Sequence, residues 1–324
     1  MCYLKKVFIV SFAFVTIFTL QTNAQLNLST VNALEQKEDT LQLLSQKMVF
    51  DEHANIRFRS DSQFVKTFIR ALQIPYSFYY NFDSLNISKL YAPDSSFKIF
   101  TWQLKKDEYV YLQKGAIQMR TPNGSLKLYP LFDNSMFTKN ILDSARNRFN
   151  WVGAIYYKII QTKHQGKPYY TLLGFDDFTV NMNKKWIETL HFDVQGEPVF
   201  GGNIFSFQND SIKKPTQSRF CLEYKKEAKA YLNFDKDLNM IIVDHLISET
   251  DEPDKKFTYV PDGDYEGFKW NNGQWVHIDK VFNFKLKDGE FPMEAILMDD
   301  IGNKDESKIK QQVNKASTPT KKKQ

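Results

Sequence analysis

Alternating carboxylates near residue 265 are the feature of this sequence best suited to chemistry. Asp262, Asp264 and Glu266 occupy alternate positions in the segment DGDYEG, which ends at Gly267. Calcium ions favour such clusters of oxygen ligands, and a glycine permits the sharp turn that a calcium-binding loop needs. Such a loop closes with a glutamate at the position that Gly273 holds here. Asp262, Asp264 and Glu266 are therefore weak candidate metal ligands, and a polar turn between two strands is the alternative interpretation.

Histidines close to aspartates form a second pattern of this kind. Residues i and i+2 of a strand point to the same face, so a His-X-Asp triplet in a strand presents two ligands together. Two such pairs that meet in space would make a zinc site or an acid–base site. Exposed His–Asp neighbours on a sheet are the alternative. The pairs are His191 with Asp193, Asp244 with His245, and His277 with Asp279.

The remaining reactive residues give two further hypotheses. Asp176 and Asp177, with Glu188, are candidates for the carboxyl pair of a glycoside hydrolase, which needs a defined separation between its two groups. Cys221 lies in the strand-like segment RFCLEY. As a nucleophile it would need a histidine partner supplied by the fold, and a small buried hydrophobe is the alternative. The sequence has no GxSxG, HExxH, Walker or GxGxxG motif, and no cofactor is predicted.

The strands that must position these residues are clearest between Trp151 and Gly201. Runs of β-branched and aromatic residues alternate there with turn residues, a pattern typical of hairpins. The connections are too short for crossover helices, so the sheets are predicted to be antiparallel. The predicted strands are residues 154–161, 169–175 and 186–193, with another beginning at Pro198.

Helical spacing precedes these strands. Leu26–Phe50 carries apolar residues at the spacing of an amphipathic helix. A second helix is predicted to begin at Asp61 or Ser62 and to run through Leu72, because Pro75 stops it.

From Phe97 onward the apolar spacing changes to period two, which indicates strands. Ser135–Asn150 has mixed signals and is predicted to form one helix across the edge of the sheet. The fold class is therefore predicted to be α+β and mainly β, with antiparallel, meander-like sheets. A helical N-terminal region at residues 25–94 precedes a β-rich domain at residues 95–303.

The first 24 residues have the pattern of a signal peptide. Lys5 and Lys6 precede the apolar run Val7–Leu20, and Thr22–Ala24 offers small residues for cleavage before Gln25. The sequence therefore predicts an exported protein, secreted or periplasmic, that is not transmembrane after cleavage near Ala24.

The C-terminal end is strongly basic. Residues 304–324 contain seven lysines against Asp305 and Glu306, so they carry much of the formal net charge of +5. Such a segment buries too little apolar surface to order itself, and we predict a disordered basic tail. A basic tail on a near-neutral body of an exported protein does not indicate nucleic-acid binding. Envelope polymers or another exported protein are the partners that it favours.

Several segments together resemble an uncharacterised family of exported proteins of the Bacteroidetes type, with no established activity. They cover about Trp151 to Val281 and read YYKII, GKPYYTLLGFDD, KKWIETLHFD, GEPVFG, NMIIVDHLIS and VPDGDYEGFKWNNGQWVHIDKV. The chain also has triplets of Asp, then Ser or Thr, then a small or aliphatic residue. These triplets resemble the O-glycosylation motif of such bacteria. The resemblance therefore implies four weak candidate glycosylation sites, Thr40, Ser84, Ser144 and Ser211.

These observations favour an exported envelope or periplasmic protein with a non-catalytic binding or structural role. One alternative is a hydrolase that acts on glycan or peptide. The other is a carbohydrate-binding module, which would use exposed tryptophans and tyrosines as stacking platforms.

Overall fold

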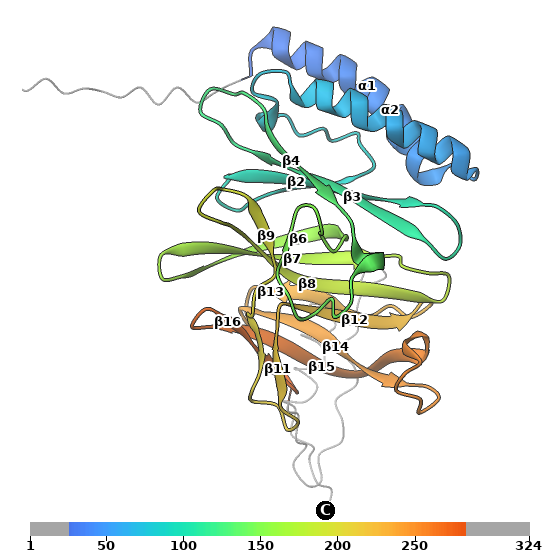
Figure 1. Ribbon diagram of the computed structural model, residues 1–324, viewed down its shortest axis with the longest axis vertical. Helices are drawn as coiled ribbons and strands as arrows, with labels where there is room; N and C mark the ends of the chain where they lie inside the picture. The colour runs from blue at the N-terminus through green and yellow to red at the C-terminus, as the bar shows by residue number, and fades with distance from the viewer. Residues whose placement is uncertain (1–25, 283–324) are drawn as a thin grey trace, which may run out of the picture. The chain divides into compact units, whose positions relative to one another are not determined.

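The computed structural model describes residues 26–282, and its first element is the helix α1, Leu28–Phe50 (Figure 1). The side chain of Asn27 accepts a hydrogen bond from the Thr30 amide at 2.8 Å. This N-cap satisfies one of the amide groups that a helix leaves free at its start. The end of α1 at Phe50 is where the apolar spacing predicts it.

The second helix, α2, is Ala54–Leu72 and begins before the predicted start at Asp61. Arg57 explains the earlier start. Its guanidinium is buried and donates to the carbonyl oxygens of Asp51 at 2.7 Å and Glu52 at 2.8 Å. A third bond to Lys105 at 2.9 Å ties this first turn to the first sheet. The turn is therefore stabilised by tertiary contacts that helical periodicity does not reveal.

The first sheet is an antiparallel meander of four strands. They are β1 Ser88–Tyr91, β2 Phe97–Lys105, β3 Tyr111–Met119 and β4 Lys127–Phe132. Both faces of β2 are buried. Along β2, Phe100, Trp102 and Leu104 pack with the helices, whereas Phe97 and Ile99 face the second sheet.

The second sheet is built around β8, Met182–Phe192. One edge of β8 pairs with β7, and the other edge is shared by two strands, β12 along its first half and β9 at its end. Gln165 and Gly166 join β6 to β7 with φ of +48° and +76°, as a two-residue hairpin turn requires. The remaining bounds are β5 Arg146–Asn147, β6 Ile155–His164, β7 Lys167–Asp176, β9 Pro198–Phe200 and β12 Arg219–Lys225.

The third sheet has the strand order β11-β10-β16-β15-β14-β13. All its pairs are antiparallel except β10 with β16, which is parallel. The bounds are β10 Phe205–Phe207, β11 Lys214–Gln217, β13 Leu232–Asp235, β14 Met240–Ser248, β15 Tyr259–Asn271 and β16 Gln274–Ile278. Single 3₁₀ turns occur at η1 Ser77–Tyr79, η2 Ser135–Phe137 and η3 Lys256–Thr258.

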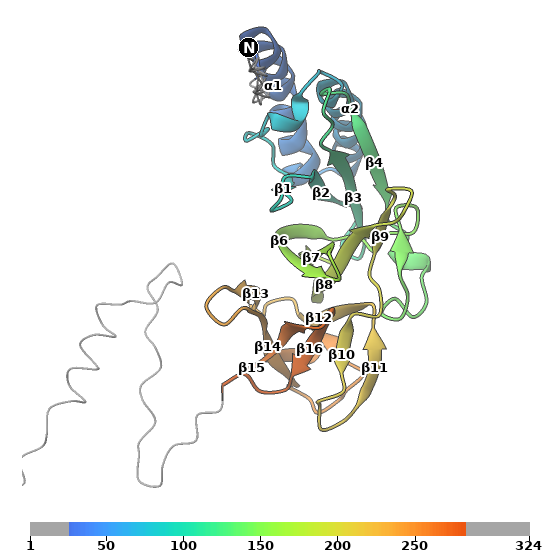
Figure 2. The same cartoon turned by 90° about the vertical axis from the view of Figure 1, so that its left-hand side faces the viewer.

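Three apolar clusters lie between the layers of helices and sheets, and Figure 2 shows these layers from the side. The first joins the helices to the first sheet, and the second joins the first sheet to the second. The third joins the second sheet to the third, with Leu173 and Ile187 packing on Phe268 and Trp275. The second sheet is therefore buried on both faces, which agrees with its long apolar runs.

The predicted fold class, α+β and mainly β with antiparallel sheets after N-terminal helices, is confirmed. The helix predicted at Ser135–Asn150 is wrong, because this segment forms only η2 and β5. Its backbone is held from outside, since the amide of Phe132 bonds Arg148 and that of Asn134 bonds Trp151.

The polar turn predicted at Asp262–Gly267 is not observed, and the predictions for the two chain ends cannot be compared with the described residues. Asp262–Gly267 lies inside β15 and is not a turn, because residues 265–269 pair in register with β14. The proposed signal peptide and basic tail lie outside the described residues. Among residues 26–282, no helix combines the length and the apolarity needed to cross a membrane.

Candidate functional site

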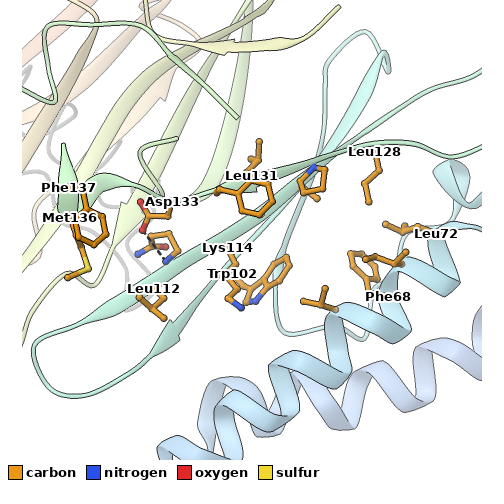
Figure 3. Close-up of a pocket in the computed structure, with 17 residues that line it drawn as sticks. Phe68, Leu72, Trp102, Leu112, Lys114, Leu128, Leu131, Asp133, Met136 and Phe137 are labelled. Atoms are coloured by element: carbon orange, nitrogen blue, oxygen red, sulfur yellow. Dashed lines mark hydrogen bonds between the residues drawn. The ribbon is translucent and has the colours of Figure 1, made fainter. Parts of the chain in front are cut away.

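An apolar groove lies between α2 and the first sheet, where β3 and β4 run past the helix (Figure 3). Its volume is about 400 Å³. The helix contributes one wall and the strands the other. The apolar side chains that line it include Val65, Ile69 and Leu72 of α2, and Leu112, Ala116 and Leu128 of the strands.

The groove exists because the helices pack mainly over β2. The ring centres of Phe64 and Trp102 lie 5.5 Å apart, and those of Phe68 and Phe100 lie 4.9 Å apart. On β3, by contrast, the small Ala116 lies among the wall residues and fills little of the space. The sheet surface beside the helix contact is therefore left as an apolar hollow.

Large exposed side chains are part of the groove lining. Phe132 at the end of β4 is 52% exposed, Met136 is 64% exposed and Phe137 is 83% exposed, and all three line the groove. Phe149 stacks on Phe132 at 6.0 Å. Exposed apolar side chains that gather in this way mark binding sites more often than isolated ones do.

A polar pocket of about 470 Å³ adjoins the groove. Gln113 and Met136 line both cavities, so the two share a wall. Two buried polar atoms in this pocket lack a hydrogen-bond partner among residues 26–282, namely Gln113 Oε1 and Trp186 Nε1. Most buried polar atoms are paired, so these two atoms give the pocket wall a hydrogen-bond acceptor and a donor that no described residue uses.

Asp176, at the end of β7, is the buried carboxyl group of the polar pocket. Burial raises its pKa to about 7, against the opposing effects of the Phe178 amide, Lys184 and Gln113. The amide of Phe178 donates to Oδ1 at 3.0 Å, and Gln113 Nε2 donates at 2.7 Å. Asp176 therefore exchanges its proton close to neutral pH.

Lys184 is the cation of this pocket. Its ammonium group bonds Glu223 at 2.8 Å and lies 3.6 Å from the ring centre of Phe178. The charge of Lys184 is thus already compensated inside the protein. With Asp176 titrating near neutrality, the polar pocket holds little net charge.

No family model, curated protein or solved structure matches this chain. The resemblance to an exported family of the Bacteroidetes type therefore stays a prediction. The site is interpreted from its geometry alone.

The alternating carboxylates of β15 are all paired, and Asp262 and Glu266 share His245, whose Nε2 lies 3.7 Å from Glu266 Oε1. Asp262 meets His245 Nδ1 at 2.8 Å, and Asp264 meets Lys280 at 2.8 Å. Glu266 accepts from His277 Nε2 at 3.0 Å. The three carboxylates therefore do not converge on one point, although Glu266 reaches a histidine that the sequence also singled out.

The three His–Asp pairs also differ from one another in their surroundings. His277 and Asp279 lie together at 3.3 Å. Asp244 is buried and accepts from the Tyr231 amide at 2.6 Å, whereas its neighbour His245 faces Asp262. His191 is half-buried, and burial lowers its pKa, which disfavours the charged form of the imidazole.

Asp176 and Glu188 do not form a hydrolase pair. Asp176 pairs in register with Lys184, and Glu188 pairs with Leu172 four positions further along. Their carboxyl groups also have separate partners, since Glu188 bonds Arg219 and Tyr156 whereas Asp176 bonds Phe178 and Gln113. Asp177 is held by Lys226.

Cys221 is half-buried on β12, and burial raises the pKa of its thiol, so its surroundings disfavour the reactive thiolate. Four of the five tryptophans of the chain are buried and Trp270 is half-buried. They offer no exposed stacking platform. The candidate glycosylation residues Thr40, Ser84, Ser144 and Ser211 are all exposed.

The groove and the polar pocket were not predicted from the sequence. Asp176 was singled out, but as a hydrolase carboxylate. One feature of the sequence could have indicated the groove. Phe132, Met136 and Phe137 are large apolar residues that cluster in a segment without regular apolar periodicity.

Proposed function

We propose that this is an exported, non-catalytic binding protein that holds a single-chain amphiphile with an uncharged, hydrogen-bonding head. The observation that carries the proposal is the shared wall of the apolar groove and the polar pocket. The chain of the amphiphile would lie in the groove and its head in the polar pocket.

The groove suits an apolar chain because of its size and its walls. Its volume of about 400 Å³ is within the range of small-molecule sites, about 300–1,000 Å³. Burial of each methylene group from water contributes about 0.8 kcal/mol. A chain in the groove would also cover Ile69 and the exposed Met136 and Phe137.

The polar pocket suits an uncharged head because its own charges are compensated. Lys184 is paired with Glu223, and the pKa of Asp176 is near neutrality. The indole N–H of Trp186 and the amide oxygen of Gln113 offer one donor and one acceptor. Hydroxyl groups, as in a glycerol ester, complement both.

A binding role agrees better with the site than a hydrolytic one. The carboxyl groups of Asp176 and Glu188 are each held by their own partners, and burial raises the pKa of the Cys221 thiol. The signal-peptide pattern of the first 24 residues supports export to the periplasm or the exterior, where such amphiphiles belong to the envelope.

Ile69→Trp tests this proposal, because it places a large ring in the groove. We expect the Kd of the fluorescent apolar probe N-phenyl-1-naphthylamine to rise at least about tenfold, as the indole takes the space of the chain. Bound probe should be displaced from wild type by a monoacylglycerol. Ile69 is 37% exposed, so the substitution should leave the fold intact.

Ile56→Trp is the matched control. Ile56 lies on the same helix with the same 37% exposure, and it is not part of the groove wall. Equal probe binding by both variants would overturn the proposal. Binding of an exported protein by wild type without binding of the probe would instead indicate that the exposed phenylalanines form a protein interface.

A further inference from the structure

A cluster of metal-ligating side chains lies at the end of β16, on a sheet that contributes no residue to the groove or the polar pocket. Asp210, His277 and Asp279 each place one donor atom within 4.8 Å of the other two. His277 Nδ1 is 2.9 Å from Asp210 Oδ2 and 3.3 Å from Asp279 Oδ1. Asp210 and His277 are buried, whereas Asp279 is exposed at the entrance.

These separations are close to those of ligands around one small cation. Two donor atoms about 2.0–2.1 Å from a tetrahedral zinc ion lie about 3.3 Å apart. The His277–Asp279 separation has this value, and the His277–Asp210 separation needs to widen by only a few tenths of an ångström. The three ligands leave one position of the tetrahedron open.

Glu266 holds the imidazole of His277 in the orientation that a metal site requires. Its Oε2 lies 3.0 Å from His277 Nε2, on the side of the ring away from Asp210 and Asp279. With a metal bound, a hydrogen bond from Nε2–H to this carboxylate would leave the Nδ1 lone pair free to coordinate it. Carboxylates fix metal-binding histidines in this way in zinc proteins.

The charges around His277 favour a divalent cation. Asp210, Glu266 and Asp279 place three carboxylates around one imidazole. Among residues 26–282, no lysine or arginine forms an ion pair with any of them, and Lys280 pairs with Asp264 instead. Two acidic ligands and one nitrogen suit Zn²⁺ better than Ca²⁺, which takes six to eight oxygen ligands.

We propose that Asp210, His277 and Asp279 bind one Zn²⁺ ion, with Glu266 as the positioning residue of His277. The site joins the loop after β10 to β16, two segments that are far apart in sequence. Zinc would therefore cross-link the parallel β10–β16 pair.

The test measures zinc binding to the chelator-treated protein by competition with a chromophoric chelator. We expect one zinc ion per wild-type chain and at least about tenfold weaker binding by Asp279→Asn, which removes a ligand. Asp279 is exposed, so this variant should fold. Glu266→Gln should bind about 10–100-fold more weakly, as expected for the loss of the residue that orients a ligand.

Asp264→Asn is the matched control, because Asp264 is an exposed carboxylate of the neighbouring strand with a partner outside the cluster. Its zinc affinity should equal that of wild type. Absence of zinc binding by wild type, or equal affinities of wild type and Asp279→Asn, would show that the cluster is only a salt-bridged histidine. Equal weakening by Asp264→Asn would assign the binding to general surface charge and also overturn the proposal.

Discussion

Arg219→Met is expected to destabilise the folded chain by about 3–5 kcal/mol, because it leaves a buried carboxylate without its partner. Arg219 is fully buried and Glu188 nearly so, with Nε and Oε1 2.7 Å apart. The guanidinium also bonds the carbonyl oxygens of Ile141 and Ser144. Loss of Arg219 would therefore loosen the 141–144 segment as well as β12.

The same network reaches the core between the first and second sheets. Glu188 Oε2 accepts from the Tyr156 hydroxyl at 2.8 Å, and that hydroxyl accepts from Trp151 Nε1 at 2.8 Å. Urea denaturation of wild type and Arg219→Met measures the loss of stability directly. A loss below about 1 kcal/mol would show that removing Arg219 does not leave Glu188 as an uncompensated buried charge.

A double variant separates charge from packing. In Glu188→Gln/Arg219→Met the uncharged amide still accepts from Tyr156, so the part of the lost stability that comes from the unpaired buried charge should return. Lys225→Met removes a cation from an exposed pair on the same strand, with Glu249, and should change stability far less. A double variant as unstable as Arg219→Met would indicate that lost packing of the arginine dominates.

Local patterns predicted the parts of the fold that local contacts determine. The strand and turn signals of residues 154–175 correspond to β6 and β7, because a two-residue turn fixes the register of a hairpin. The first helix was predicted from its apolar spacing alone, and it ends at Phe50 as expected. The bounds of such elements follow from local signals, although their packing still involves distant segments.

Contacts between distant segments could not be predicted. β8 shares one edge between β9 and β12, and no periodicity within β12 indicates that choice. β15 was missed as a strand because Asp262–Gly267 has turn residues, yet pairing with β14 on one side and β16 on the other holds it extended. Tertiary pairing here outweighs local preference.

The candidate sites divide in the same way. The pair His277/Asp279 was recognised from its i, i+2 spacing, because residues on one strand face share a direction. Asp210 was not, since it comes from a loop 67 residues away. The groove beside α2 also has no sequence signature, because it results from where two helices settle on a sheet.

Asp176→Asn is expected to stabilise the folded chain at alkaline pH and to leave it nearly unchanged at acid pH. An aspartate in the unfolded chain has a pKa of about 4, whereas burial raises the pKa of Asp176 to about 7. Between these values the folded chain keeps a proton that the unfolded chain has lost. The free energy of unfolding therefore falls as pH rises through this window.

The size of the effect follows from the shift. One pKa unit corresponds to about 1.4 kcal/mol, so a shift of about three units makes the cost of ionising Asp176 on the order of 4 kcal/mol above about pH 7. The asparagine never ionises, and its Oδ1 can still accept from Phe178 and Gln113. The stability difference between variant and wild type should accordingly grow from near zero at about pH 4 to this value at about pH 8.

Urea denaturation of both proteins across this pH range is the measurement. The comparison cancels other titrating groups, such as Lys98, whose pKa burial lowers to about 7. Asp177→Asn is the control, because that carboxylate is paired with Lys226 and only partly buried, so the variant should gain no stability with rising pH. A difference between Asp176→Asn and wild type that is independent of pH would show that the Asp176 carboxyl is solvated, and the polar pocket would then be an ordinary surface depression.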